Sequence, residues 1–344
     1  FQYLKMFLKK GYVVKFIGDN YLHEEPYTST LQQMGIEVLY GQEYLTGIWD
    51  WLVKNGKDIH VAYLNRPHIA TKYVDFIKEH TDIKMIYYGH DLHFMREFRE
   101  YELTGDVKKR QESEYWKSIE FSLFHKVAVS YYPSYVEEEA IHAVDETIPV
   151  KAITAYVYEE FLQNLNKDFA KREGLLFVGG FAHPPNADAV LWFAKEVFPK
   201  IREQIKVNFY IVGSKVTDEI KALEQPGNGI IVKGFVSEEE LADLYRNCRI
   251  VVVPLRYGAG VKGKVVEAIY NGAPIVTTSV GSEGIPDVEK VLLVKDQPDE
   301  FAETVVELYK DEKRLEDLAE KTQVYIREHF SIDAAWDVIK EDFE

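Results

Sequence analysis

The feature that most constrains the fold is a pattern of strand, glycine-rich loop, helix and strand within residues 249–284. An apolar run at residues 250–253 predicts a buried parallel strand. A helix is predicted over residues 261–271 and a second strand over residues 274–278. Such a unit folds as part of a parallel sheet that is covered by helices. The loop before the helix contains three glycines, which are Gly258, Gly260 and Gly263.

The residues around this loop indicate an anion-binding site. Arg256, Lys262 and Lys264 bring three positive charges to it. Glycines allow the backbone to approach a ligand, and a helix N-terminus adds unpaired N–H donors and a partial positive charge. A diphosphate would relieve the mutual repulsion of the cations, and Glu267, one turn into the helix, could accept both hydroxyls of a ribose. The alternative is a solvated loop with surface lysines.

The loop also spells G-x-G-x-x-G over residues 258–263. In a dinucleotide-binding fold this motif directly follows the first strand, and an acidic residue lies about 20 residues further on. Here the motif follows a late strand, and residues 277–279 include no carboxylate. Nicotinamide binding is therefore disfavoured.

The same stretch resembles the donor-site signature of retaining glycosyltransferases of the group 1, or family 4, type. The second half of that signature is matched by Glu267, Ala268, Gly272, Pro274, Ile275 and Val276. Residues 254–264 resemble a bacterial surface-polysaccharide branch of the family. The resemblance implies the GT-B fold: α/β, with two Rossmann-like parallel-sheet domains that face a cleft and a C-terminal helix that crosses back to the first domain.

The resemblance also assigns roles. Glu267 would bind the donor ribose, while the family's first Glu, which contacts the donor sugar, maps onto Ala259. We expect Glu283 to accept a sugar hydroxyl in its place, although a solvated loop acid is an equal alternative. The family's two diphosphate-binding cations map onto Gly180 and Pro185. We therefore expect the loop cations to replace them.

The complete predicted donor-binding set combines this loop with two other turns. Residues 234–236 would dock the nucleotide base through their backbone, or they are a plain strand end. In the turn over residues 179–186, Asn186 would cap the following helix. The donor-binding residues are Gly180, His183, Gly234, Phe235, Val236, Arg256, Gly258, Gly260, Val261, Glu267, Glu283 and Gly284, and Lys262 and Lys264 would stabilise the departing diphosphate in catalysis.

A second group of polar residues follows a predicted strand at residues 83–88 of the first domain. By resemblance, His90 faces the donor sugar and has a catalytic role, and we expect Asp91, His93 and Arg96 on the acceptor side. Ligands of open α/β sheets bind beyond the carboxyl ends of the strands. A metal site at His90, Asp91 and His93 is an alternative, but no fourth ligand stands at a useful spacing. A helix-capping Asp91 with solvated histidines is another alternative.

Strand and helix patterns alternate through both halves, which predicts two parallel sheets. We predict a first domain over residues 1–160, a linker over 161–173, a second domain over 174–328 and a last helix over 329–344, with one long helix over 298–327. The first element, residues 1–10, reads as a helix. Since a Rossmann-like domain starts with a strand, we expect a strand and its loop to be missing before it.

Composition excludes several classes of protein. The 344 residues carry a formal net charge of −16, which disfavours binding to duplex nucleic acid. One cysteine cannot form a disulfide within the chain, which fits a cytoplasmic protein. Peripheral association with the inner face of the membrane stays open. No apolar run reaches the ~18 residues of a membrane span. No Asp-x-Asp motif is present. We therefore expect neither a metal nor another cofactor.

The resemblance implies a retaining glycosyltransferase, and the absence of an Asp-x-Asp motif favours a metal-independent one. It would move a sugar from a nucleoside-diphosphate sugar to a glycan or lipid-linked acceptor. Two alternatives stay open. The first is a non-catalytic binding module of a larger protein, and the second is a sugar-nucleotide epimerase on the same fold.

Overall fold

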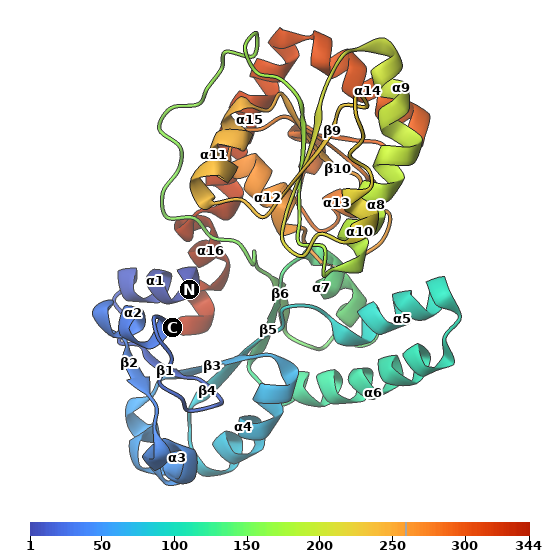
Figure 1. Ribbon diagram of the computed structural model, residues 1–344. Coiled ribbons are helices and arrows are strands. Elements are labelled where there is room, and N and C mark those ends of the chain that lie inside the picture. The colour runs from blue at the N-terminus through green and yellow to red at the C-terminus, as the bar shows by residue number, and fades with distance from the viewer. Residues whose placement is uncertain (259) are drawn as a thin grey trace. The chain divides into compact units, whose positions relative to one another are not determined.

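The computed structural model describes residues 1–258 and 260–344, so Ala259 and the expectation attached to it lie outside the described residues. The chain forms two compact units (Figure 1). The first contains residues Phe1–Val157 and Ile332–Glu344, and the second contains Tyr158–Ser331. Every strand pairing within the sheets of the described residues is parallel, which confirms the predicted α/β class.

The first unit contains two parallel sheets. One sheet pairs β1 (Lys15–Ile17) with β2 (Glu37–Leu39), and the other has the order β3 (Val61–Asn65), β4 (Lys84–Tyr88), β5 (Val129–Tyr132), β6 (Val150–Ala152). α1 (Gln2–Lys9) precedes the first strand. The helices that connect the strands are α2 (Tyr27–Gln33), α3 (Gln42–Asn55), η1 (Gly56–Asp58), α4 (Pro67–His80), α5 (His93–Thr104), α6 (Val107–Phe124) and α7 (Tyr135–His142). Between β4 and β5 the helices α5 and α6 form an antiparallel hairpin (Figure 1).

The last helix, α16 (Ile332–Ile339), and the short η4 (Lys340–Phe343) belong to the first unit. Ile339 and Phe343 pack in a buried cluster with Met6 and Phe7 of α1. The Tyr131 hydroxyl of β5 donates a hydrogen bond of 2.6 Å to Asp342 Oδ2, which belongs to η4. The last helix thus returns to the first unit, as expected for the fold.

The second unit is built on a six-stranded parallel sheet with helices around it. Its strand order is β12 (Leu292–Val294), β11 (Ile275–Thr277), β10 (Ile250–Val253), β7 (Leu175–Val178), β8 (Phe209–Val212), β9 (Ile230–Gly234). The helices are α8 (Pro184–Trp192), η2 (Phe193–Val197), α9 (Phe198–Gln204), α10 (Asp218–Lys221), α11 (Glu238–Asn247), α12 (Gly263–Tyr270), α13 (Ser279–Ser282), η3 (Val288–Lys290), α14 (Pro298–Lys310) and α15 (Glu312–Phe330). All four residues of β10 are buried, as the apolar run predicted.

Three predictions about helix ends are wrong. The helix predicted over residues 298–327 is two helices, because Asp311 leaves the helical conformation and its side chain accepts the N–H of Arg314 to cap α15. The helix predicted from residue 261 begins at Gly263. Asn186 does not cap α8: His183 is at the cap position, because two prolines occupy the first two helical positions, where no N–H is needed.

Candidate functional site

The strand order of the second unit indicates where a ligand binds. From β7 the chain proceeds to β8 and β9 on one side of the sheet, and then to β10, β11 and β12 on the other. The order reverses between the neighbours β7 and β10. In open α/β sheets, ligands bind outside the carboxyl ends of the strands at such a switch point. The helices α8 and α12 follow these two strands, so their N-termini face this place.

Asn186 joins the two helix N-termini. Its amide donates a hydrogen bond of 2.8 Å to the Gly180 carbonyl, and its side-chain oxygen accepts a hydrogen bond of 2.6 Å from Lys264 Nζ. Asn186 is buried. The amide therefore fixes Lys264, the second residue of α12, against the turn that follows β7. The predicted cap role of Asn186 is thus replaced by a link between two elements.

The electrostatic environment of this turn is cationic. Burial, and next the positive charge of Lys262, lowers the pKa of Lys264 to about 8. Burial, followed by the charges of Lys264 and Lys262, also lowers the pKa of His183, which is exposed at the N-terminus of α8. Each of these shifts means that a further positive charge is disfavoured here. An anion would reverse that penalty.

Lys262 and Glu283 form the second contact of the site. Lys262 is only 8% exposed, and its Nζ donates to the Gly260 carbonyl and lies 3.5 Å from Glu283 Oε2. Glu283 is half-buried at the end of α13, and Gly284 follows it with a φ of +75°. The structure therefore brings Lys262 together with Glu283, which lies 21 positions further along the chain and is followed by Gly284.

Arg256 has a partner that the sequence did not suggest. Its Nε donates a hydrogen bond of 2.9 Å to Asp188 Oδ2, and a second N–H donates to Oδ1. The guanidinium also lies 6.0 Å from the ring centroid of Trp192. Both partners belong to α8. Arg256 is thus held in a two-point ion pair on that helix, and it would have to leave this pair to contact a diphosphate.

Glu267 lies half-buried in α12, next to the buried Tyr245 of α11. Burial raises the pKa of the Glu267 carboxyl, and the nearby Tyr245 hydroxyl opposes this shift. The Tyr245 hydroxyl has no hydrogen-bond partner within normal bonding distance among the described residues.

The remaining predicted donor-binding residues lie in turns at strand and helix ends. Gly234 ends β9 with a φ of +70°, and its carbonyl accepts the Gly213 N–H at 2.8 Å. Phe235 is 81% exposed and Val236 is half-buried. The other three are in the loop before α12: Gly258 and Gly260 with positive φ, and the half-buried Val261.

Gly213, which the sequence did not single out, packs so closely on the turn after β7 that a side chain is excluded there. A Cβ at this position would lie 1.9 Å from the Gly179 carbonyl oxygen, which is a direct clash. We expect Gly213→Ala to reduce the free energy of unfolding by about 2–4 kcal/mol. Chemical denaturation measures this. Gly47→Ala is the control, since a Cβ at this helical glycine meets no atom within 4 Å. Equal stability of the two variants would contradict the prediction.

In the first unit, His90 is exposed directly after β4. Its ring lies edge-on to Tyr88, with centroids 4.8 Å apart. Burial, and next the positive charge of Arg66, lowers the pKa of His90. Arg66 follows the neighbouring strand β3 with a φ of +62°. Sequence reasoning missed this arginine because its closeness to His90 depends on the pairing of β3 with β4.

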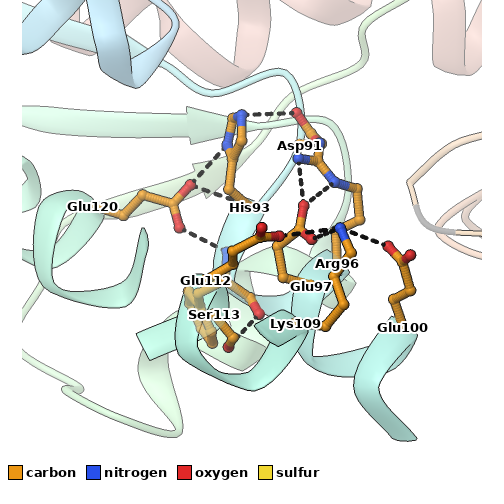
Figure 2. Close-up of polar contacts among 10 residues, drawn as sticks. Asp91, His93, Arg96, Glu97, Glu100, Lys109, Glu112, Ser113 and Glu120 are labelled. Carbon is orange, nitrogen blue, oxygen red and sulfur yellow. Dashed lines mark hydrogen bonds and ion pairs between the residues drawn. The ribbon is translucent and has the colours of Figure 1, made fainter. Parts of the chain in front are cut away.

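The predicted acceptor-side residues form a network with the α5–α6 hairpin (Figure 2). Asp91 accepts a hydrogen bond from Arg96, and its Oδ1 lies 3.8 Å from His93 Nε2. The buried Glu120 of α6 accepts the backbone N–H of His93 at 2.9 Å and contacts its Nδ1 at 3.1 Å. Glu120 was not predicted, since 27 residues separate it from His93. In the described part of the chain, no group of three or more His, Cys, Asp and Glu side chains is arranged to hold a metal ion.

The chain resembles known proteins in sequence and in structure. Residues 172–311 match the model of the glycosyl transferases group 1 family. The chain is 29% identical over 184 residues to an uncharacterized 44.6 kDa protein in the cps region of Klebsiella pneumoniae. That match covers 51% of this chain and 45% of the relative, so the chain spans less than half the length of this curated relative.

Three solved structures show the same fold at low sequence identity. A sucrose-phosphate synthase of Thermosynechococcus elongatus has a TM-score of 0.69 and 15% identity, over 99% of this chain and 91% of that one. Anabaena HepE with UDP and glucose has a TM-score of 0.66 and 14% identity, over 98% and 93%. Staphylococcus aureus TarM with UDP has a TM-score of 0.63 and 14% identity, over 86% and 58%.

No helix within the described residues combines the length and the apolar composition that a membrane span requires.

The fold, the strand order and the family match agree with one another. The chain has the GT-B fold, and within it residues 172–311 match the group 1 glycosyltransferase family model.

Proposed function

We propose that this protein transfers a sugar from a nucleoside-diphosphate sugar, with UDP as the nucleotide, to a glycan or lipid-linked acceptor. The observation that carries the proposal is the placement of Lys262 and Lys264 at the N-terminus of α12, at the switch point of the sheet. Support for UDP comes from the related folds of HepE, solved with UDP-glucose, and pneumococcal GtfA, solved with UDP and GlcNAc.

In this proposal the second unit stabilises the departing diphosphate. Negative charge develops on the leaving group in the transition state, so cations and helix N-termini held there in advance lower the barrier. Lys262 and Lys264 supply that charge without a divalent metal. Glu267 accepts the ribose hydroxyls and Glu283 accepts a sugar hydroxyl, and the family resemblance assigns His90 a catalytic role toward the transferred sugar. We infer retention of the anomeric configuration from the family resemblance.

The low pKa of Lys264 gives this site a pH dependence. Only the protonated lysine attracts a diphosphate, and in the free protein the ammonium group loses its proton at about pH 8. We expect UDP affinity to fall as the pH rises above that value, by up to about tenfold per pH unit. Calorimetric titration from pH 7 to 9.5 measures this. Lys264→Arg should remove the slope, and a wild-type affinity that stays constant over this range would contradict the role.

Turnover of the donor is the direct test of the proposed activity. The protein is incubated with UDP-glucose, UDP-galactose, UDP-GlcNAc and GDP-mannose, with and without mixed glycan acceptors, in the presence of EDTA. We expect acceptor-dependent release of the nucleoside diphosphate from one donor. Conversion of the donor sugar without an acceptor would instead identify an epimerase.

A non-catalytic binding module is the second candidate. The observation that favours it is that Arg256, Lys262 and Lys264 all have internal partners: Asp188, Glu283 and Asn186. Binding of UDP, without release of a nucleoside diphosphate from any of the four donors, would support this second candidate.

A further inference from the structure

The polar network at the start of α5 leaves one carboxylate facing outward. The buried Glu120 caps α5, because it accepts the backbone N–H groups of His93 and Phe94 at 2.9 and 3.1 Å. It also holds the imidazole of His93 through Nδ1 (Figure 2). The other ring nitrogen of His93 then points at Asp91. Glu120 therefore fixes the ring that lies beside Asp91.

Asp91 is held by an ion pair with Arg96 and remains accessible. Arg96 donates to one of its oxygens, and His93 Nε2 lies 3.8 Å from the other (Figure 2). Its side chain is 29% exposed. A carboxylate has about four acceptor positions, so Asp91 can still accept hydroxyl hydrogen bonds from a ligand.

Aromatic rings extend from this network along α6. The Trp116 ring lies 4.5 Å from the His93 ring between centroids, and the Tyr115 ring lies 5.5 Å from that of Trp116. Tyr115 is 60% exposed. The exposed Tyr115 ring thus offers apolar contact to a ligand, and the Asp91 carboxylate, at the other end of this chain of contacts through Trp116 and His93, offers hydrogen-bond acceptors.

The charge of the hairpin excludes two classes of ligand. Residues 93–124 contain six Lys and Arg and seven Asp and Glu side chains. Several of these neutralise one another, as where Lys109 contacts Glu97 at 2.7 Å and Glu112 at 3.1 Å. A surface without net positive charge does not attract an anionic membrane or a nucleic acid. A neutral sugar has hydroxyls for the carboxylate and a C–H face for an aromatic ring.

We propose that Asp91, Trp116 and Tyr115 form the binding site for a neutral sugar of the acceptor. Asp91 accepts the sugar hydroxyls and the rings pack on its C–H face, while Glu120 and His93 are positioning residues. The site follows β4, at the carboxyl end of the sheet. This inference rests on the proposed function, since an acceptor sugar is needed only by a glycosyltransferase.

The experiment is a saturation-transfer NMR titration of the whole chain, without turnover. The probes are the methyl glycosides of glucose, galactose, mannose and N-acetylglucosamine. We expect at least one to bind, and we expect Tyr115→Ala and Asp91→Asn to weaken that binding about tenfold. Phe98→Ala is the matched control, because Phe98 is a 43% exposed aromatic residue of the same hairpin outside this set.

Two results would overturn the proposal. One is that none of the glycosides binds the wild-type protein, and the other is that Tyr115→Ala and Asp91→Asn bind as tightly as wild type. UDP affinity, measured on the same samples, tests the proposed function separately. If the wild-type protein did not bind UDP, the proposed function would be overturned. The glycoside titration alone decides whether the sugar site exists.

Discussion

Replacing both lysines at the N-terminus of α12 should nearly abolish the binding of UDP while leaving the binding of uridine almost unchanged. Lys262→Ala with Lys264→Ala removes two charge-assisted contacts to the diphosphate, at roughly 1.5–3 kcal/mol each. We expect a loss of at least about 100-fold in UDP affinity and of less than about threefold in uridine affinity. Isothermal titration calorimetry measures both ligands.

The matched control keeps the change in charge and moves it away from the site. Lys195 and Lys221 belong to the same unit and have side chains that are 59% and 61% exposed. Lys195→Ala with Lys221→Ala should bind UDP as the wild type does. If the α12 double variant lost UDP and uridine equally, the lysines would support the structure of the site and would not contact the phosphates.

Removing the buried carboxylate of Glu120 should strongly destabilise the first unit. Glu120→Ala leaves two backbone N–H groups of α5 and the imidazole of His93 without their acceptor. Unpaired buried polar groups are expensive, and we expect the free energy of unfolding to fall by about 3–5 kcal/mol. Urea denaturation followed by circular dichroism measures this.

Glu114→Ala is the control on the same helix. Its side chain is 69% exposed and lies 3.4 Å from Arg110, a type of surface pair that contributes at most about 1 kcal/mol. We expect a change in stability below that value. A Glu120→Ala variant as stable as Glu114→Ala would show that water replaces the carboxylate, and would remove the basis for a fixed Asp91.

The sequence predicted the elements that depend on local patterns. The apolar run of β10, the glycine turn and the helix after it follow from periodicity and backbone preferences. The structure confirms β10 and the existence of the helix, which begins two residues later than predicted. The helix break at Asp311 was missed, although five consecutive charged residues over 310–314 interrupt the apolar periodicity there. A short polar side chain that can cap a helix was the available signal.

Contacts between distant segments could not be predicted. Asp188 and Arg256 pair across 68 positions of sequence, and Asn186 and Lys264 pair across 78. Each pair depends on β7 and β10 being neighbours, and no local pattern specifies that order. The predicted residues of the loop were therefore identified by type, whereas their partners follow only from the strand order.

The most direct test of the donor site is a thermal-shift screen of the wild-type protein with UDP, GDP, ADP, CMP and dTDP, with and without EDTA. A ligand at 100 times its dissociation constant stabilises the folded state by about 2.7 kcal/mol. We predict a rise in Tm of several degrees with UDP that EDTA leaves unchanged. No shift with any of the nucleotides, or a shift that EDTA abolishes, would contradict a metal-independent diphosphate site at the N-terminus of α12.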